Sequence, residues 1–347
     1  MPTLSEPQLR DLGISVLSAA GVPKADAEVV ANELAEANLV GHDSHGVMRL
    51  VQYVQMIQDG HVKPGTPIET VREGAGFAVL NANFNLGQIA AQAALRIALA
   101  KAKAIGTATV MVRDCNHVGR LGSYVEQATR EGCLALMAVN SPGPGGVAPY
   151  GGIDRKLGTN PICMAAPWKG SAVVLDMTTS ATAEGKLRVA FQKGEMVGEG
   201  VMIDGSGRPT VNPADYYNKP YGAILPLGGN MGHKGFGLAV MLDVFCGILS
   251  GAGVAREDLP RGSNGVWMHV LEVERFLPRS EYDAWMQRYV DYLKDCRLQN
   301  GCTEILLPGE IELRRRKDRE AQGVAIPDET WRQINETAAK LGAQIRI

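Results

Sequence analysis

The first 60 residues of the chain repeat apolar positions with the period of an α-helix. Three helices are predicted there, because each apolar run has its own start and end signals. The first follows a capping serine, Ser5, and ends at Gly21, the second covers 26–40, and the third runs from about 44 to 58. Each helix should therefore bury one face against the rest of the protein.

From Phe77 onward, short apolar runs alternate with longer amphipathic segments. The predicted strands are 77–81, 107–113, 133–140, 162–166, 172–177, 266–274 and 303–307. The predicted helices are 86–105, 119–131, 183–193, 234–250, 278–298, 309–321 and 328–341. This alternation indicates an α/β fold with a largely buried sheet. Two Gly- and Pro-rich stretches, 141–158 and 204–232, are too long to be simple connectors, so each is expected to line a site.

The order of these segments also predicts how the chain is divided. Helices occupy both ends and strands occupy the middle, so the two ends are expected to pack together as one helical lobe. We place this lobe at residues 1–70 together with 309–347, and the sheet-bearing domain at 71–308. A length of 347 residues fits two lobes better than a single compact one.

The charge balance narrows the class of partner. Lys and Arg number 35 and Asp and Glu number 37, so the chain offers no basic field for a nucleic acid and no polybasic anchor for a membrane. The longest apolar stretch, 238–249, contains Asp243 and is well short of the roughly 20 residues that a membrane-spanning helix needs. We therefore expect neither a nucleic-acid partner nor a membrane span.

The six cysteines are scattered along the chain and include no C-x-x-C pair. Most lie in apolar runs, where a thiol behaves as a small hydrophobic group, so neither disulfides nor a cysteine metal site is expected. The N-terminal residues lack the basic and apolar regions of a secretory signal, which favours a cytoplasmic protein.

A literal match to the dinucleotide fingerprint G-x-G-x-x-A occurs at 143–148, after the predicted strand 133–140. In a Rossmann fold this loop must open a helix. Here Pro149, Gly151 and Gly152 follow, and no helical run or suitably spaced acidic residue comes after them. A Rossmann fold is therefore not predicted, although these glycines still allow backbone amides to approach a phosphate closely.

The segment GHDSHGVMRL carries the first group of chemically useful residues. His45 and Arg49 stand four residues apart at the start of the third predicted helix, so they are expected to share a face. Reduction of a 2-keto acid needs an arginine fork to hold the carboxylate and an acid to protonate the adjacent oxygen. Ser44 could cap the helix or donate to the substrate. The alternative, a capping serine beside two solvated side chains, stays open on spacing alone.

Other polar residues lie near predicted strand ends or helix starts. His117 stands between strand 107–113 and the next helix, where α/β sheets place their ligands. Lys234 lies among glycines just before a long apolar helix, an arrangement that suits a phosphate or a ribose. Asp176 and Glu310 are acidic candidates for binding ribose hydroxyls or for orienting a histidine. A backbone-bonded histidine and a solvated lysine remain the alternatives.

Seven strings occur in one order along nearly the whole chain: DSHGVMRL, NHVGRLGSY, NSPGPGGVAPYGG, LGTNP, VLDMTTS, GHKGFGLA and LPGE. In this order they resemble the malate/L-lactate dehydrogenase family of non-Rossmann NAD(P)-dependent oxidoreductases. That family also includes ureidoglycolate, sulfolactate and diketogulonate dehydrogenases and piperideine-2-carboxylate reductases. Seven ordered motifs are far more specific than any single one, so the functional interpretation of these residues is favoured.

The resemblance implies an enzyme that transfers a hydride between NAD or NADP and a small 2-hydroxy acid, its 2-keto counterpart or a cyclic 2-imino acid. It implies a non-Rossmann NAD(P)-binding domain at 71–308. The helical lobe at 1–70 and 309–347 would then serve substrate binding and dimerisation. The resemblance also implies a homodimer whose active site is completed by the partner chain.

Particular residues follow from the matching motifs. Those implied in catalysis are Ser44, His45, Arg49 and His117. Arg49 would hold the substrate carboxylate, with Thr159 and Asn160 nearby. The cofactor residues would be His117, Ser141, Val174, Leu175, Asp176, Met177, Thr178, Thr179, Ser180, His233, Lys234, Glu304, Ile305, Leu306, Leu307, Pro308, Gly309 and Glu310. Which histidine transfers the proton, and whether the cofactor is NAD or NADP, are left open. The loop PLGGNMGHKG also carries extra residues relative to the GGHKG form typical of the family, which leaves the substrate open.

The main alternative is a metal-dependent hydrolase or lyase that uses His45, His117 and His233 with Asp43 or Asp176. Neither H-E-x-x-H nor another compact ligand spacing is present, so no metal is predicted. Activity that survives a chelator, in a protein with no bound zinc, would exclude this alternative.

Overall fold

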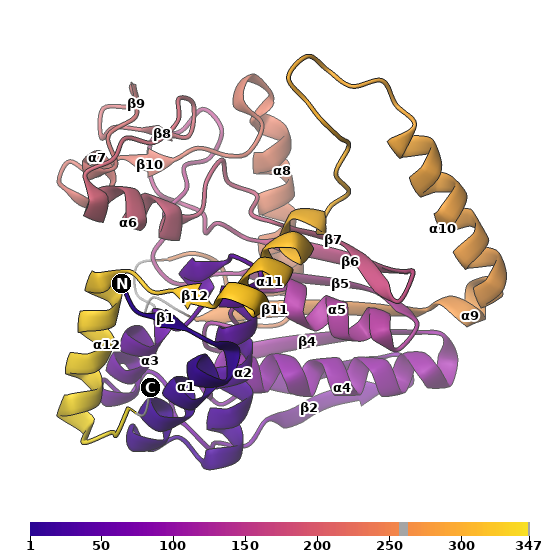
Figure 1. The fold of residues 1–347 in the computed structure, drawn as a ribbon, viewed down its shortest axis with the longest axis horizontal. Coiled ribbons are helices and arrows are strands. Elements are labelled where there is room, and N and C mark those ends of the chain that lie inside the picture. The colour runs from indigo at the N-terminus through magenta and orange to yellow at the C-terminus, as the bar shows by residue number, and fades with distance from the viewer. Residues whose placement is uncertain (257–262, 346–347) are drawn as a thin grey trace.

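A mixed sheet of seven strands forms the centre of the computed structural model, which describes residues 1–256 and 263–345 (Figure 1). Its strands, in their order across the sheet, are β2 (Glu69–Gly74), β3 (Phe77–Asn81), β4 (Thr107–Cys115), β11 (Asn264–Glu272), β5 (Cys133–Asn140), β6 (Ile162–Trp168) and β7 (Ser171–Met177). β3 and β4 pair in parallel, and the other neighbouring strands pair antiparallel. The predicted α/β fold is therefore confirmed.

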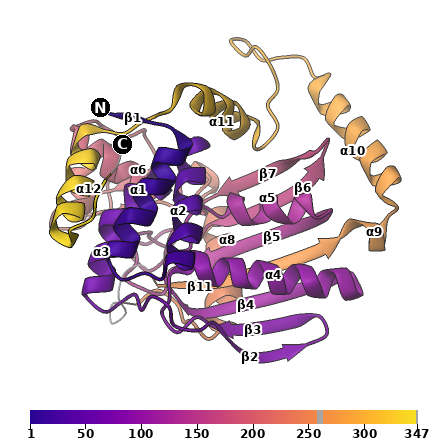
Figure 2. The ribbon, with the colours of Figure 1, turned by 60° about the horizontal axis from the view of Figure 1, so that its bottom comes forward.

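Helices cover both faces of this sheet (Figure 2). They are α4 (Gly87–Ile105) and α5 (Gly122–Arg130) on one face, and α8 (His233–Leu242) with its π-helical continuation (Asp243–Ile248) on the other. Side chains along β5 alternate between the two layers. Met137 packs in the core that includes α4 and α5, whereas Ala138 packs with Leu242 and Cys246. Because β5 is buried on both sides, its sequence is almost continuously apolar.

The helices at the two ends of the chain pack together, as the sequence predicts. They are α1 (Glu6–Ala19), α2 (Lys24–Leu39), α3 (Arg49–Gln58), α11 (Glu310–Gln322) and α12 (Asp328–Leu341). A short ladder joins the ends, because β1 (Thr3–Leu4) pairs antiparallel with β12 (Val324–Ala325). Leu9, Leu34, Leu50 and Ile334 belong to one hydrophobic cluster, so α1, α2, α3 and α12 bury their apolar faces against one another.

A smaller cluster of elements lies within the residues assigned to the sheet domain. It comprises α6 (Glu184–Lys193), β8 (Met202–Ile203), β9 (Pro209–Thr210), α7 (Ala214–Tyr217) and β10 (Ala223–Ile224). The three strands form a separate sheet in the order β10-β8-β9, and Leu187, Met202 and Tyr216 share their own core. The sequence pattern missed these strands because each is only two residues long. The division of the chain at 70 and 309 stays a prediction.

One helix stands away from the rest of the molecule. The short α9 (Val273–Phe276) leads into α10 (Arg279–Lys294), which projects from the end of the sheet in both views (Figures 1 and 2). Trp285, Tyr289 and Tyr292 lie on α10 at intervals of four and three residues and are 57%, 58% and 78% exposed. Exposed aromatic side chains that line one face of a helix are typical of a surface that another molecule covers.

The third predicted helix is wrong at its start. Residues Asp43–His45 form a single 3₁₀ turn, and Gly46 is extended with φ −85° and ψ −157°, so α3 begins only at Arg49. His45 and Arg49 are therefore not on one helix, and the shared face inferred from their spacing does not exist. Residue 46 must be glycine, because a Cβ there would lie 2.2 Å from Asn38 Oδ1.

Two further predictions about strands need correction. Residues 303–307 do not form a strand, and the segment meets the edge strand β7 through one backbone hydrogen bond, from Val174 N to Pro308 O (3.0 Å). Conversely, β2 was missed because its side chains are mostly polar and exposed. The stretch 143–148 opens no helix, as expected, and Val147 instead bridges to Leu157 and Ile224.

Candidate active site

The turn that carries Ser44 and His45 is held by the end of α2. Asn38 Nδ2 donates to Asp43 Oδ1 (2.7 Å), and Asn38 Oδ1 accepts from Val47 N (2.9 Å). Asn38 is buried, so its amide is fixed and clamps the turn from both ends. The backbone N of His45 also donates to the carbonyl of His42 (2.8 Å). The Ser44 and His45 side chains are thereby presented in one direction.

The Arg49 side chain folds back onto this turn. Its Nε donates to the Ser44 carbonyl (2.6 Å), and its Nη1 donates to Gln52 Oε1 (2.5 Å). A Cβ built on Gly185, at the start of α6, would lie 2.8 Å from Ser44 Cβ and 3.9 Å from Arg49 Nη2. The guanidinium thus lies next to the turn that carries His45 because the side chain folds back, and not because the two residues share a helix. The start of α6 lies beside it.

His117 is fixed by the loop that follows β4. Asn116 Nδ2 donates to the Phe84 carbonyl (2.7 Å), and Val118 N donates to Asn264 Oδ1 (3.1 Å). A Cβ on Gly87, at the start of α4, would lie 2.3 Å from the His117 carbonyl oxygen. The backbone around His117 is therefore tightly packed on both sides.

The two histidine rings are stacked. Their centroids lie 5.4 Å apart and their planes differ by 21°. His45 Nδ1 contacts Ser44 Oγ at 3.0 Å, and His117 Nδ1 contacts Tyr53 Oη at 2.7 Å. In both rings the contact to the protein uses Nδ1, which leaves Nε2 as the nitrogen for a ligand.

A buried hydrogen-bond chain reaches Nδ1 of His117. Gln88 Nε2 donates to Tyr53 Oη at 2.8 Å, and in this arrangement the Tyr53 hydroxyl can donate to an unprotonated Nδ1. Among the described residues, Gln88 Oε1 has no partner. If the amide rotates, this oxygen accepts from Tyr53, and Tyr53 then accepts from a protonated Nδ1. The chain can therefore serve both protonation states of His117.

Burial controls the charge of these groups. It lowers the pKa of His45 to about 3 and the pKa of His117 well below its usual value, and the positive charge of Arg49 is the next cause in both cases. Burial raises the pKa of Tyr53 to about 12, so its phenol stays a neutral donor. Both histidines are therefore neutral near pH 7, and an anion paired with Arg49 would raise their pKa values by offsetting its charge.

Replacing Tyr53 by Phe tests this hydrogen-bond chain. For the 2-keto acid reduction that the sequence motifs imply, we expect kcat to fall about 10- to 100-fold, because Nδ1 of His117 loses its hydrogen-bond partner. Tyr124→Phe is the matched control, since Tyr124 is equally buried and donates to the Val118 carbonyl (2.6 Å). The melting temperature should fall similarly in both variants. A kcat loss of the same size in both would contradict a role for Tyr53 beyond packing.

Several predicted cofactor residues meet where β5 and β7 end and β6 begins. A Cβ on Gly158 would lie 2.6 Å from Asn160 Oδ1 and 3.1 Å from Ser141 Cβ, so the loops that carry Ser141 and Asn160 touch. Thr179 joins them, because its backbone N donates to the Thr159 carbonyl (3.0 Å) and its Oγ1 donates to the Asn160 carbonyl (3.0 Å). Residues 141, 159, 160 and 179 therefore pack together, with Asn160 and Thr179 buried and Ser141 and Thr159 half-buried.

The segments 174–180 and 304–310 also lie together. Val174 N donates to the Pro308 carbonyl, and Gly309, at φ +92°, lies so close that a Cβ would be 3.2 Å from Val174 N. Leu307 is buried and Leu175 is exposed, while Ile305, Leu306 and Met177 are half-buried. Several polar groups here are already bonded within their own segments: Thr178 Oγ1 to Ser180 O, Ser180 Oγ to Thr182 O, Leu307 N to Glu310 Oε2, and Glu304 to Arg314.

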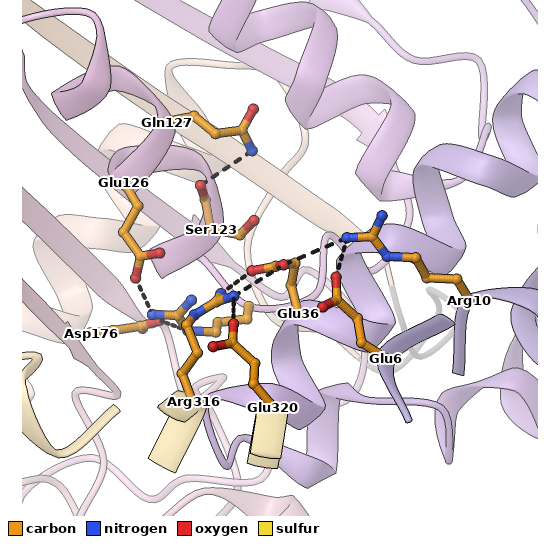
Figure 3. Close-up of polar contacts among 10 residues, drawn as sticks. Glu6, Arg10, Glu36, Ser123, Glu126, Gln127, Asp176, Arg316 and Glu320 are labelled. Atoms are coloured by element: carbon orange, nitrogen blue, oxygen red, sulfur yellow. Dashed lines mark hydrogen bonds and ion pairs between the residues drawn. The ribbon is translucent and has the colours of Figure 1, made fainter. Parts of the chain in front are cut away.

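Asp176 has a structural partner that the sequence did not reveal. Its Oδ2 accepts from the backbone N of Gly122, at the start of α5 (2.9 Å), and lies 3.8 Å from Arg120 Nε. Arg120 also pairs with Glu126 at 2.5 Å, so its guanidinium lies near two carboxylates, Glu126 and Asp176, whose side chains are labelled in Figure 3. The positive charge of Arg120 also helps to lower the pKa of His45, after burial, Arg49 and His42.

His233 and Lys234 are exposed at the start of α8. The His233 ring packs edge-on against Tyr150, at 5.8 Å between centroids. A Cβ on Gly235 would lie 2.2 Å from the Leu227 carbonyl, so the preceding loop folds tightly under the helix, and Leu227 N donates to the Thr179 carbonyl (2.9 Å). The first N–H groups of a ten-residue helix, next to a lysine, fit the pyrophosphate of a dinucleotide.

Sequence reasoning missed Tyr53 and Gln88. Tyr53 lies four residues after Arg49 on α3, and a polar aromatic residue within an apolar helical stripe was the available signal. Gln88 offered a similar signal, as a lone amide in the first turn of an Ala- and Leu-rich helix. Neither signal identifies His117 as the partner.

Two features of the described residues concern a membrane span and a metal site. Within residues 1–256 and 263–345, no helix combines the length and apolarity needed to cross a bilayer. In the same ranges, no three or more His, Cys, Asp and Glu side chains gather in an arrangement that could hold a metal ion. The hydrolase or lyase hypothesis, which requires such a cluster of His45, His117 and His233, is not supported.

Comparison with known proteins gives one consistent result. The model of the malate/L-lactate dehydrogenase family matches residues 4–335. The malate dehydrogenase of Pyrococcus horikoshii is 36% identical over 339 residues, which cover 95% of this chain and 93% of that protein. L-sulfolactate dehydrogenase of Methanocaldococcus jannaschii is 34% identical and covers 97% and 96%. Hydroxycarboxylate dehydrogenase B of Escherichia coli is 33% identical and covers 93% and 90%.

Solved structures agree with these relatives. A putative malate/lactate dehydrogenase from E. coli superimposes with a TM-score of 0.93 at 32% identity and covers 99% of this chain and 96% of that one. Delta1-piperideine-2-carboxylate reductase from Pseudomonas syringae superimposes with a TM-score of 0.83 at 27% identity and covers 97% and 100%.

Proposed function

This chain belongs to the malate/L-lactate dehydrogenase family and is a dehydrogenase of 2-hydroxy acids. We propose that its reaction takes place between the stacked histidines and Arg49. The substrate would be a small 2-hydroxy acid and its 2-keto counterpart, with NAD(P) as the hydride carrier. The observation that carries this proposal is the half-buried stack of His45 and His117 beside the Arg49 guanidinium.

Arg49 would hold the substrate carboxylate. Its Nε and Nη1 are bound to the turn and to Gln52, which fixes the guanidinium plane, and Nη2 lies toward the start of α6. A carboxylate bound to Arg49 places the adjacent carbonyl beside the histidines. The same carboxylate offsets the charge that depresses the histidine pKa values, so substrate binding prepares the site for proton transfer.

In the direction of reduction, His117 would carry a proton on both nitrogens once the substrate carboxylate is paired with Arg49. It would donate the Nε2 proton to the substrate oxygen and remain neutral with its hydrogen on Nδ1, bonded to Tyr53 Oη. Tyr53 and Gln88 support this role, because they can bond to Nδ1 whether or not it is protonated. His45 has only the Ser44 hydroxyl at its Nδ1, so we assign it to orienting the substrate and packing against His117. In the direction of reduction the substrate carbon gains a hydride and the oxygen gains this proton, which balances the reaction.

The dinucleotide would be held along β7. The groups that fit it are the half-buried Ser141 and Thr159, the segments 174–180 and 304–310, and the start of α8 with Lys234. When bound, the nicotinamide supplies or accepts the hydride. Thr159 and Asn160 join these groups to the substrate side through their contacts with Thr179.

The test is an absorbance assay at 340 nm with NADH and with NADPH against a panel of 2-keto and cyclic imino acids. We expect oxidation of the reduced cofactor with at least one 2-keto acid, and we expect it to survive EDTA. No oxidation with any member of the panel, by a folded protein that binds the cofactor, would refute the proposed substrate class.

The proposal includes a homodimer with a composite site. Two apolar surfaces support it: the aromatic stripe of α10, and an outward surface formed by Met241, Val244 and Ile248 of α8 and its continuation with Met164 and Leu175 of the sheet. Because one chain carries both the projecting arm and an uncovered apolar face, a two-fold pair can cover both at once. The free thiols of all six cysteines support a reducing compartment, so we also propose a cytoplasmic location.

We expect the triple substitution of Trp285, Tyr289 and Tyr292 by Ser to convert a dimer into a monomer and to abolish most of the activity. The reason is that the arm would lose its apolar contact with the partner. Light scattering should report twice the 37.1 kDa chain mass for the wild type and a single mass for the variant. Phe77→Ser removes an exposed ring from the β2–β3 hairpin and should leave the dimer intact. A triple variant that stays dimeric would refute the arm as the interface.

A further inference from the structure

Helix α11 places a stripe of charged side chains against the end of α2 and the turn that follows it. The stripe consists of Glu312, Arg315, Arg316 and Arg319, which recur at intervals of three, one and three residues on one helical face. α11 has no buried residue, so it is held in place by polar contacts and not by an apolar face. The position of this helix therefore depends on what each of these side chains binds.

Three members of the stripe contact α2 or the residues just after it. Arg316 pairs with Glu36 of α2, and Figure 3 shows this pair together with Glu320. The side chain of Arg315 packs on Gly41, where a Cβ would lie 2.6 Å from Arg315 Cδ. Glu312 Oε1 lies 3.5 Å from the ring of His42. These contacts attach α11 to the helical lobe without touching Ser44 or His45.

Arg319 differs because it binds the catalytic turn itself. Its Nη1 lies 2.7 Å from Asp43 Oδ1 and its Nη2 lies 3.0 Å from Asp43 Oδ2, which is a two-bond fork on one carboxylate. Nη1 also donates to the carbonyl of Asn38, in the last turn of α2. Asn38 in turn donates to the same Asp43 carboxylate. The guanidinium thus joins the end of α2 to the first residue of the turn.

The turn needs such support. Asp43–His45 is one 3₁₀ turn of three residues with extended backbone after it, and a segment this short has little stability of its own. The Asp43 side chain is half exposed, so its orientation is set by its bonds to Asn38 and Arg319 and not by packing. A shift of this turn moves Ser44, His45 and, through the Ser44 carbonyl, the Arg49 guanidinium.

We propose that Arg319 is a positioning residue for the dehydrogenase reaction: by gripping Asp43 it fixes the turn that presents Ser44, His45 and the anchored Arg49 to the substrate. This inference rests on the proposed function of that turn. The competing explanation is that Arg319 only helps to dock α11, as Arg316 does. The two explanations predict different kinetics.

The experiment compares Arg319→Ala with Arg316→Ala. Each variant removes one arginine–carboxylate pair between α11 and the region of α2, but only Arg319 touches the turn. For Arg319→Ala we expect kcat/KM for the best 2-keto acid to fall about 10- to 100-fold, because small displacements of positioning groups are costly. The dissociation constant of NADH should stay within about two-fold. Arg316→Ala should change kcat/KM by less than about three-fold, although its melting temperature falls by a similar amount.

Two further measurements separate positioning from docking. Arg319→Lys should recover only part of the lost activity, since an ammonium cannot form the two-bond fork. Hydrogen exchange of the peptide covering 42–48 should become faster in Arg319→Ala and should be unchanged in Arg316→Ala. The amides of His45 and Gly46 are bonded within this turn, and the amide of Val47 is bonded to Asn38, so all three report on its stability.

The outcomes distinguish the two claims. Equal losses of kcat/KM in Arg319→Ala and Arg316→Ala, or unchanged exchange at 42–48 in Arg319→Ala, would overturn the positioning role. If the wild type oxidised no NADH or NADPH with any 2-keto acid, the proposed substrate class would fail instead. In that case the exchange comparison would still decide whether Arg319 holds the turn.

Discussion

Replacing His117 by Gln should lower kcat for reduction of the best 2-keto acid by about 10²- to 10⁴-fold, the range for loss of a positioned general acid. Gln occupies a similar volume and its amide can still bond to Tyr53, so the fold and the cofactor site should survive. Fluorescence titration with NADH should therefore give nearly the wild-type dissociation constant. Steady-state rates at 340 nm, with a deuterated cofactor to show that hydride transfer limits the rate, provide the measurement.

His45→Gln is the matched comparison for this prediction. The two rings are stacked and both have pKa values held low by burial and by Arg49, so the same substitution probes nearly the same environment. We expect a smaller loss of kcat and a larger effect on KM, because His45 lacks the Tyr53 and Gln88 chain. A large kcat loss in His45→Gln with near-normal kcat in His117→Gln would reverse the assignment of the proton donor.

The lowered pKa of His117 determines how the folding stability changes with pH. The pKa of His117 in the free protein lies below the value in an unfolded chain, so the unfolded state binds the extra proton more readily as the pH falls below about 6.5. The wild type should therefore lose stability between that pH and the lowered folded pKa. His117→Gln should lose less stability than the wild type over the same acidic range.

Replacing Arg49 by Lys should reduce kcat/KM for the best 2-keto acid by about 2–5 kcal/mol, or roughly 30- to several-thousand-fold. A lysine keeps the charge, but it cannot bond the Ser44 carbonyl, Gln52 and a carboxylate at the same time from one plane. The substrate would then be held without a fixed orientation, and its carbonyl would no longer be kept beside the histidines.

The methyl ester of the same substrate supplies the control for Arg49. The wild type should use the ester poorly, and Arg49→Lys should lose little further activity on it, because the charged group that Arg49 binds is already absent. Equal losses on the acid and on the ester would show that Arg49 serves the fold or the cofactor. Arg120, which is paired with Glu126, would then be the next candidate for the clamp.

Much of the architecture could be predicted from the sequence because it depends on local signals. The periods of α1, α2, α4 and α12 and the apolar runs of β4, β5 and β11 report which faces are buried, and their capping and glycine positions set their ends within a few residues. The rejection of a Rossmann loop at 143–148 also needed only local information, since no helix follows it. The ordered motifs identified the family, and the comparisons confirm it.

The structure of the site depended on contacts that no local pattern contains. Tyr53 meets His117 across 64 residues, Gln88 meets Tyr53 across 35, and Arg319 meets Asp43 across 276. Even the short interval from His45 to Arg49 was misread as one helix, because the backbone at Gly46 is extended and packs closely on Asn38 of another element. The sequence by itself determined the elements and the residue types of the chemistry. The tertiary structure alone decided which groups contact each histidine nitrogen, which charges lie close together and how deeply they are buried, because these properties arise when distant segments pack and exclude water.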